Sequence, residues 1–331
     1  MKYRLLGATG LRVSEIGFGG WGIGGSTEGA AAYGRTDDRE SLAALRRAFE
    51  SGVTCYDTAD LYGAGHSESL IGEAFKAVRS QVVIASKAGR VDAAGGQDFS
   101  PAHLRASLEQ SLRRLRTDYL DVYQLHDPPM DRLLEQPEIL ATMRALQREG
   151  RIRAVGVSCR SPQEALMAIE QLAIRCVQVN FNLVDQRAIE CGLLARCEAL
   201  GAGVIARTPL CFGFLSGAYE PQRQFAADDH RSRWSEPQRV LWAQAPQRFA
   251  SLLDGSKDSP AQFALRFCLS YRSVATAIPG MLTVQHVEEN VAASALGPLP
   301  SDARDAIEAI YQQHAFFVER GRSNMMMETR A

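Results

Sequence analysis

One stretch of the sequence contains the pattern that decides the fold. It begins with VVIASK at residues 82–87, continues with PAHLRASLEQSLRRLR at residues 101–116, and ends with YLDVYQL at residues 119–125. The first and last segments are apolar on successive residues, which is typical of parallel strands covered on both faces. The middle segment is amphipathic and starts with Ser100-Pro101, an N-cap residue followed by proline at the first helical position. The stretch is therefore a predicted strand–helix–strand unit.

The same alternation recurs along the whole chain. The expected strands span residues 15–19, 54–57, 82–87, 119–125, 152–157, 176–179, 203–206 and 274–278. The expected helices span residues 39–51, 67–78, 101–116, 132–149, 162–172, 187–200, 260–271 and 283–293. Eight strands, each followed by a helix, predict an α/β fold of the closed (β/α)8 TIM-barrel type. A doubly wound open sheet shows the same alternation, and the count of eight decides against it.

The remaining segments are assigned around this barrel. Residues 3–6 and 11–13 flank GATG and predict a hairpin within residues 1–14 that closes the barrel bottom. Residues 208–259 are expected to be a long loop with some helix inside. A further helix is expected at residues 301–318, and the tail at residues 319–331 is expected to be mobile. No linker or shift in composition divides the 331 residues, so a single barrel domain is predicted.

Composition narrows the possible partners. Thirty-seven basic residues against thirty-eight acidic ones leave a formal charge of −1, which gives no support to a nucleic acid or an acidic membrane as partner. No window reaches the roughly 18 apolar residues of a membrane span, and the first residues do not resemble a signal peptide. The seven cysteines are scattered without a CxxC pair, as expected for reduced thiols. We therefore expect a cytoplasmic protein that acts on a small molecule.

Polar side chains stand at the ends of three neighbouring expected strands. Asp57 ends the second strand, Lys87 ends the third, and His126 follows the fourth. In a barrel the carboxyl ends of the strands meet at one mouth, where active sites lie, and adjacent strands are about 4.8 Å apart. These side chains are therefore expected to converge, and the loop after Asp57 can carry Tyr62 back to them. Each residue alone is more often structural, so the prediction depends on their joint placement.

These four residue types suit proton transfer. A tyrosine hydroxyl has a reference pKa of about 10 and is by itself a poor acid at neutral pH. A nearby lysine ammonium favours the tyrosinate, an aspartate can hold that ammonium, and a histidine can orient a carbonyl. Such a set can protonate an alkoxide as it forms, or deprotonate an alcohol in the reverse direction. Asp57, Tyr62, Lys87 and His126 are the predicted catalytic residues.

Longer segments around these residues resemble the aldo-keto reductase family. They are GVTCYDTADLYG at residues 52–63, VIASK at residues 83–87 and LDVYQLH at residues 120–126, and the likeness covers most of the chain. The resemblance implies an NAD(P)H-dependent oxidoreductase that reversibly transfers hydride between the nicotinamide and an aldehyde, ketone, alcohol or sugar-like substrate. It implies that Tyr62 is the general acid/base and that Lys87 tunes it.

The resemblance also assigns the other two catalytic residues and a cofactor surface. Asp57 would pair with Lys87, and His126 would orient the substrate carbonyl. The implied cofactor-binding residues are Gly20, Trp21, Asp57, Ser158, Cys159, Gln178, Arg207, Thr208, Leu210, Gly213, Gly280, Leu282, Thr283, His286, Glu289 and Asn290. An apolar substrate wall is expected from Trp21, Tyr56, Leu61, Phe212, Phe214 and either Trp234 or Trp242.

Three positions depart from the family pattern. Cys159 stands where an asparagine usually binds the nicotinamide carboxamide, and a thiol is a poorer hydrogen-bonding group. Arg207 replaces an aromatic ring that stacks on the nicotinamide, which a planar guanidinium can also do. Leu282 replaces a basic or polar residue that binds the adenosine 2′-phosphate. The family cofactor is NADP(H), and Leu282 makes NAD(H) a second possibility.

Two other functions share parts of this pattern. One is a cofactor-binding regulatory subunit that resembles the potassium-channel β-subunits and turns over slowly. The other is a barrel hydrolase that uses Asp57 and His126 on a metal, but the six histidines show no HxH or HExxH spacing, so no metal site is predicted. No exposed apolar stripe selects an oligomeric state.

Overall fold

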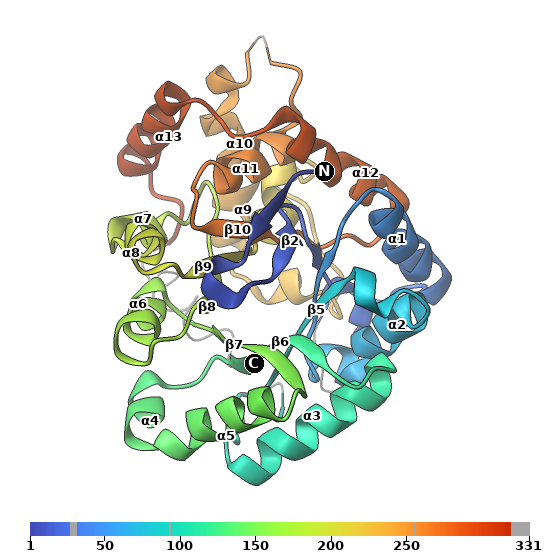
Figure 1. Ribbon diagram of the computed structural model, residues 1–331. Helices are drawn as coiled ribbons and strands as arrows, with labels where there is room; N and C mark the ends of the chain where they lie inside the picture. The colour runs from blue at the N-terminus through green and yellow to red at the C-terminus, as the bar shows by residue number, and fades with distance from the viewer. Residues whose placement is uncertain (27–31, 93, 255, 319–331) are drawn as a thin grey trace.

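A closed parallel sheet forms the centre of the molecule (Figure 1). The structure, a computed structural model, describes residues 1–26, 32–92, 94–254 and 256–318, and in these ranges eight parallel strands follow one another in sequence order. They are β3 (Phe18–Gly19), β4 (Cys55–Asp57), β5 (Val83–Ala88), β6 (Leu120–His126), β7 (Ile152–Ser158), β8 (Cys176–Asn180), β9 (Gly203–Arg207) and β10 (Val274–Ala277). Parallel bridges from Ile16 to Ala277 and from Gly19 to Gly280 join the first strand to the last. The predicted (β/α)8 barrel is therefore confirmed, and the predicted tail at residues 319–331 lies outside the described residues.

Helices surround this sheet and cover its outer face (Figure 1). The larger ones are α1 (Asp38–Glu50), α2 (His66–Phe75), α3 (Pro101–Leu115), α5 (Pro137–Arg148), α6 (Pro162–Gln171), α8 (Leu193–Leu200), α11 (Pro260–Leu269) and α12 (Val284–Leu296). Ser100, Ser161 and Ser259 accept hydrogen bonds from backbone N–H groups at the starts of α3, α6 and α11, each followed by proline. The serine–proline signal therefore marks helix starts correctly.

Three predicted helices are wrong in extent. The helix predicted at residues 132–149 is interrupted between α4 (Met130–Glu135) and α5, because the residue before Pro137 is non-helical. The one predicted at residues 187–200 is divided into α7 (Arg187–Glu190) and α8 by Gly192, whose φ is +76°. The helix predicted at residues 301–318 ends earlier, as α13 (Ser301–Gln313), and the following Phe316 packs on Tyr311 and Phe249.

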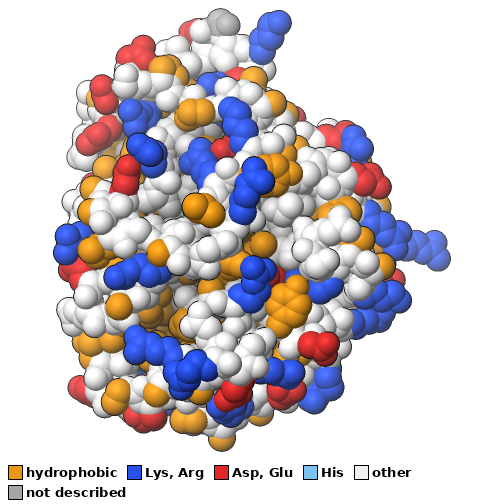
Figure 2. Space-filling model, viewed as in Figure 1, with side chains coloured by type: hydrophobic (Ala, Val, Ile, Leu, Met, Phe, Trp, Pro, Cys, Tyr) orange, Lys and Arg blue, Asp and Glu red, His pale blue; other side chains and the backbone are white. Residues whose placement is uncertain are grey.

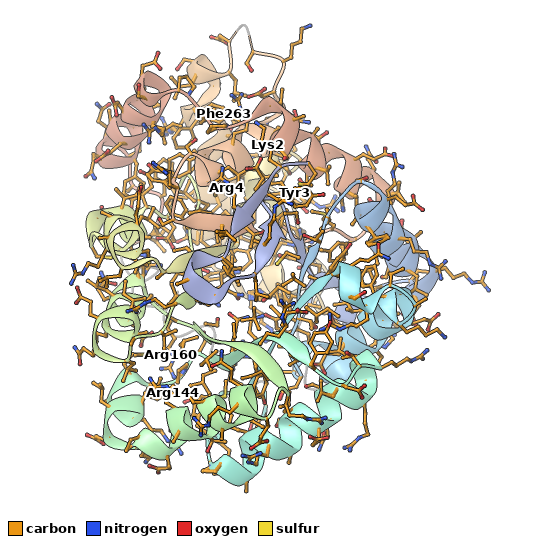
Figure 3. The ribbon with its side chains drawn as sticks, in the orientation of Figure 1. Lys2, Tyr3, Arg4, Arg144, Arg160 and Phe263 are labelled. Atoms are coloured by element: carbon orange, nitrogen blue, oxygen red, sulfur yellow. The ribbon has the colours of Figure 1, made fainter. Side chains whose placement is uncertain are left out.

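The N-terminal hairpin closes one end of the barrel, as predicted. It consists of β1 (Tyr3–Leu5) and β2 (Arg12–Ser14), which lie across the barrel in Figure 1. Apolar side chains of this segment and of the barrel strands form one buried cluster. The hairpin segment contributes Leu6, Leu11 and Val13, and the barrel strands contribute Cys55, Val83, Val122, Cys176, Ile205 and Ala275. Arg4 (Figure 3) donates to the carbonyls of Leu269, Tyr271 and Val274 and fastens the hairpin beside β10.

The long segment at residues 208–259 contains short helices and is attached to the first βα loop. The helices are η5 (Cys211–Ser216), η6 (His230–Arg233), α9 (Glu236–Ala243), α10 (Ala245–Arg248) and η7 (Ala250–Leu252). The backbone N–H of His230 donates to the carbonyl of Ala32 at 2.7 Å. Arg231 forms a salt bridge with Asp229 and lies over the ring of Tyr33. This contact fixes the two segments to each other at the mouth of the barrel.

Charged side chains of both signs are interspersed on the face shown in Figure 2, and hydrophobic side chains there form small separate groups. Among the helices of the described residues, none has the length and apolar character needed to cross a membrane.

Candidate active site

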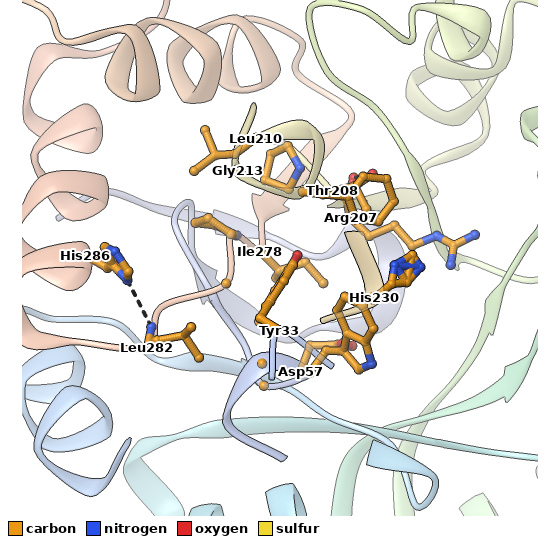
Figure 4. A pocket seen from close by; sticks show the side chains of 18 of the residues that line it. Tyr33, Asp57, Arg207, Thr208, Leu210, Gly213, His230, Ile278, Leu282 and His286 are labelled. Carbon is orange, nitrogen blue, oxygen red and sulfur yellow. Dashed lines mark hydrogen bonds between the residues drawn. The ribbon is translucent and has the colours of Figure 1, made fainter. Parts of the chain in front are cut away.

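A cavity of about 540 Å3 opens where the barrel strands end. Its volume lies within the range of ordinary cofactor and ligand sites, about 300–1,000 Å3. Figure 4 shows Leu282 and His286 at one side of it, Arg207 and His230 at the other, and Tyr33 between them. Tyr62 and His126 also line it. The cavity is therefore built at the strand ends, where barrel enzymes hold their substrates.

Lys87 connects Asp57 with Tyr62 at the base of this cavity. Its Nζ donates to Asp57 Oδ1 at 2.5 Å, to the carbonyl of Thr58 at 2.9 Å and to the Tyr62 hydroxyl oxygen at 3.1 Å. Lys87 is fully buried, and burial alone would lower its pKa. The charge of Asp57, with the hydrogen bonds to Asp57 and Tyr62, outweighs burial and raises the pKa of Lys87. Lys87 is therefore an ammonium held against the tyrosine oxygen.

His126 is close to the same tyrosine and is uncharged. The His126 and Tyr62 rings lie edge to face, 6.0 Å between centroids. Burial, reinforced by the positive charge of Lys87, lowers the pKa of His126 to about 3. Its Nδ1 has no hydrogen-bond partner among the described residues. A neutral imidazole at this place can still donate a hydrogen bond from one ring nitrogen to a substrate oxygen.

Two buried amides hold the second oxygen of Asp57. Gln178 donates to Asp57 Oδ2 at 2.7 Å, and Gln124 donates to the same oxygen at 3.1 Å. Gln178 was expected only at the nicotinamide carboxamide, and Gln124 was not expected at the site. The signal for Gln124 is its position on β6, two residues before His126, because alternate residues of a strand face the same side. A polar residue on that face belongs to the same interior as His126.

Most of the expected cofactor residues line the cavity. Those that do are Gly20, Trp21, Asp57, Gln178, Arg207, Thr208, Leu210, Gly213, Gly280, Leu282, His286, Glu289 and Asn290. Ser158 and Cys159 are fully buried behind its wall, and Thr283 is not part of it. Ser158 donates to Asp127 Oδ1 at 3.5 Å, and Cys159 Sγ lies 4.0 Å from the carbonyl oxygen of Val157.

The substrate wall differs in part from expectation. Trp21, Leu61, Phe212 and Trp234 line the cavity, whereas Tyr56, Phe214 and Trp242 are buried in the core. Tyr56 precedes Asp57 on β4, and adjacent residues of a strand point to opposite faces. Its ring therefore lies outside the barrel against Phe75, with centroids 4.3 Å apart. Trp21 packs edge-on against Tyr33 and His230.

The residues present fit a nicotinamide dinucleotide. The amide nitrogen of Gln178 is engaged by Asp57, while its Oε1 has no hydrogen bond among the described residues and remains an acceptor for a carboxamide. A Cβ added to Gly280 would meet only Tyr33, at 3.7 Å, so the backbone there is open to the cavity. The Arg207 guanidinium donates to the carbonyl of Cys159 at 2.9 Å, and Figure 4 shows it directed away from His286.

The start of α12 lies at the other end of the cavity. Thr283 is the N-cap residue and accepts a hydrogen bond from the backbone N–H of His286. The backbone N–H of Leu282 donates to His286 Nδ1 at 3.3 Å (Figure 4). Partial burial lowers the pKa of His286, against the opposite effect of Glu40. The imidazole is therefore neutral at pH 7 and adds no positive charge for a phosphate.

Comparisons with known proteins agree with this geometry. Residues 15–312 match the Aldo/keto reductase family. The chain is 34% identical to "Aldo-keto reductase YhdN" of Bacillus subtilis over 237 residues, 70% of this chain and 69% of the relative. It is 28% identical to "L-galactose dehydrogenase" of Arabidopsis thaliana over 304 residues, 88% of each chain. Among solved structures, the glycerol dehydrogenase AKR11B4 of Gluconobacter oxydans is similar, with TM-score 0.78, 28% identity, and coverage of 96% of this chain and 97% of that one.

The chain belongs to the aldo-keto reductase family. The family consists of NAD(P)H-dependent oxidoreductases that act on small-molecule carbonyl substrates, and membership assigns this class of activity to the protein. The family binds NADP(H) or NAD(H).

Proposed function

We propose that the protein reversibly transfers hydride between NAD(P)H and a carbonyl or alcohol, with Tyr62 as general acid/base. The observation that supports this most directly is the buried chain of hydrogen bonds from Asp57 through Lys87 to the Tyr62 hydroxyl, beside His126 at the cavity base. The nicotinamide cofactor, when bound, supplies or accepts the hydride.

The protein residues manage the proton and the charge on the substrate oxygen. Neutral His126 donates a hydrogen bond to the substrate carbonyl and orients it. Tyr62 gives its proton to that oxygen as negative charge develops there, and the Lys87 ammonium stabilises the phenolate that remains. Asp57 keeps Lys87 in place. In the oxidative direction Tyr62 accepts the proton of the alcohol.

The cofactor would be held by residues from several strand ends. Gln178 Oε1 would accept from the carboxamide, and the backbone near Gly213 and Gly280 would lie along the phosphates. No Lys or Arg among the described residues lines the cavity at the start of α12, where Leu282 stands. We therefore propose that NADH is accepted as well as NADPH.

The test is Tyr62→Phe. Proton transfer by a positioned side chain contributes about 10²–10⁴-fold, so cofactor oxidation with an aldehyde panel should fall by that factor. Cofactor binding, measured by quenching of tryptophan fluorescence, should persist. Tyr123→Phe is the matched control, because Tyr123 is buried outside the cavity and its hydroxyl donates to the carbonyl of Leu104. Unchanged turnover in Tyr62→Phe would refute the mechanism.

A further inference from the structure

The Arg90 guanidinium lies at the cavity wall with its hydrogen-bonding capacity unused. Arg90 follows β5 by two residues, lines the cavity together with Tyr62 and His126, and has a side chain that is 10% exposed. Among the described residues its guanidinium makes no hydrogen bond, and its charged contact is Asp127 Oδ2 at 3.7 Å. A guanidinium has five N–H donors, and those of Arg90 are accessible from the cavity that the side chain lines. The side chain is therefore prepared for an acceptor that enters the cavity.

Arg207 approaches the same carboxylate from β9. Its Nη2 lies 3.8 Å from Asp127 Oδ1, and its Nε is buried without a hydrogen-bond partner among the described residues. Asp127 thus lies between Arg90 and Arg207, and neither approaches it within ordinary hydrogen-bond distance. Asp127 Oδ2 is itself buried and also lacks a hydrogen bond within the described part of the chain. Arg90, Arg207 and Asp127 all line the cavity, so a ligand that enters it meets the guanidinium donors beside their counter-ion.

The cluster carries an excess of positive charge. A third arginine, Arg160 (Figure 3), donates Nε and Nη2 to the Asp127 carbonyl at 3.1 and 2.8 Å. Burial raises the pKa of Asp127, but the positive charges of Arg207, Arg90 and Arg160 outweigh it and lower that pKa, so the carboxylate is ionised. Glu164 accepts from the backbone N–H of Arg160. Among the described residues, this cluster therefore contains three guanidinium groups, from Arg90, Arg160 and Arg207. It contains two carboxyl groups, from Asp127 and Glu164.

This charge lies at the catalytic end of the cavity. Of the described residues that line it, the Lys and Arg side chains are Arg90, Arg207 and Arg231, and Arg231 donates to both carboxylate oxygens of Asp229. The positive charges of Arg90 and Arg207 both act on His126. Arg90 lines the cavity together with Tyr62 and His126, so it can meet a negative group on a molecule whose oxygen contacts His126.

We propose that Arg90, assisted by Arg207, binds an oxyanion on the substrate, so that preferred substrates are carbonyl compounds or alcohols that carry a carboxylate or a phosphate. The proposal rests on the proposed hydride transfer and adds a substrate class to it. A guanidinium binds either group through two parallel hydrogen bonds. Asp127 is the counter-ion in the free protein, and its loose contacts leave the guanidinium donors available to the substrate.

The test compares substrates that differ in charge. Butanal is paired with succinic semialdehyde for the carboxylate, and glyceraldehyde with glyceraldehyde 3-phosphate for the phosphate. A charge-assisted hydrogen bond corresponds to about 10- to 100-fold in an equilibrium constant. The ratio of kcat/KM for the charged member over the neutral member should reach that range in at least one pair, which identifies the oxyanion.

Variants then assign the effect to Arg90. Arg90→Gln should bring the ratio close to one, and Arg90→Lys should retain part of it, because lysine keeps the charge without the fork geometry. Asp127→Asn should raise the ratio, because it removes the competing carboxylate. Arg46→Gln, on the exposed face of α1, is the control and should leave the ratio unchanged. Melting temperatures show that each variant is folded.

The two proposals fail in distinguishable ways. Tyr62-dependent reduction of neutral aldehydes without any preference for the charged member would overturn the oxyanion site and leave hydride transfer standing. A preference that persists in folded Arg90→Gln would also overturn it. Absence of reduction for every carbonyl would overturn the proposed function, and the oxyanion site with it.

Discussion

Gln124 donates its side-chain amide to Asp57 Oδ2 at 3.1 Å, and both side chains are almost completely buried. The opposite oxygen of the same carboxylate accepts from Lys87. Gln124 therefore reaches the proton-transfer residues through Asp57, without lining the cavity itself. We regard it as a positioning residue, because a buried carboxylate that loses a donor must be satisfied elsewhere or change its orientation.

Gln124→Leu should lower both stability and turnover. Loss of a hydrogen bond to a charged group costs about 1.5–3 kcal/mol, so urea unfolding should show a decrease of that size, and kcat should fall by about 10-fold. Gln238→Leu is the matched control: Gln238 is equally buried, donates to the carbonyl of Phe316, and lies outside the cavity wall. It should lose stability with kcat retained. Equal loss of kcat in both variants would contradict the positioning role.

His126 should contribute no inflection to the pH–rate profile near neutrality. Burial lowers its pKa to about 3, so the imidazole is charged only below about pH 4 and is neutral from pH 5 to 8. His126→Gln, which keeps a neutral donor, should be slower by about 10- to 100-fold, with a profile of the same shape over that range. An inflection near pH 6.5 that is present in the wild type and absent in the variant would show that His126 titrates there.

Leu282→Arg should shift the cofactor preference toward NADPH. Leu282 lies where α12 begins, beside an imidazole that is neutral at pH 7, so a new guanidinium can bind the 2′-phosphate without competition. The ratio of kcat/KM for NADPH over NADH should rise at least about 10-fold. Leu282→Met is the control and should leave the ratio unchanged. A strong preference of the wild type for NADPH would contradict the proposal that Leu282 allows NADH to bind as well as NADPH.

Asp60 should make the protein less stable as the pH rises. Burial, with the nearby charge of Glu68, raises the pKa of Asp60 to about 7, whereas an unfolded aspartate titrates at about 3.9. Between these values the folded state holds the extra proton, so the free energy of unfolding falls as the pH increases. Asp60→Asn should therefore be more stable than the wild type by about 1–2 kcal/mol at pH 8, and the difference should shrink toward pH 5.

Urea unfolding at both pH values measures this effect. Asp118→Asn, at an exposed aspartate, makes the same chemical change on the surface and is the control. A constant difference between Asp60→Asn and the wild type at both pH values would exclude the titration of Asp60 as its cause.

The barrel, and the convergence of the four residues proposed as catalytic, could be predicted because the sequence signals are repeated along the chain or depend on several positions together. Each buried parallel strand corresponds to a run of apolar residues in the sequence. The carboxyl ends of these strands lie together at one end of the barrel, so residues at the strand ends are close in space. Asp57 and Lys87 lie at neighbouring strand ends, and the loop after Asp57 carries Tyr62 to them. The helix interruptions at Pro137 and Gly192 follow from local backbone preferences. The sequence-based prediction missed them because it gave more weight to the continuous amphipathic pattern.

Side-chain direction was the part that the sequence could not supply. Arg207 stands where the family pattern has a ring that stacks on the nicotinamide, and its guanidinium donates to the Cys159 carbonyl near Asp127. That direction depends on a carboxylate directly after β6 and a carbonyl directly after β7, which no local pattern connects. The role of Gln124 depends in the same way on a partner 67 positions away.

The hairpin closes one end of the barrel, and the cavity lies at the opposite end. Arg4 and the buried apolar cluster shared by the hairpin and the strands hold the hairpin end of the barrel together. The residues proposed as catalytic lie at the opposite end. An engineer can therefore reinforce the sealed end for heat resistance, or attach a tag or a surface anchor there, without reshaping the substrate's entrance. The cavity proposed to hold cofactor and substrate opens at the end of the barrel opposite the hairpin.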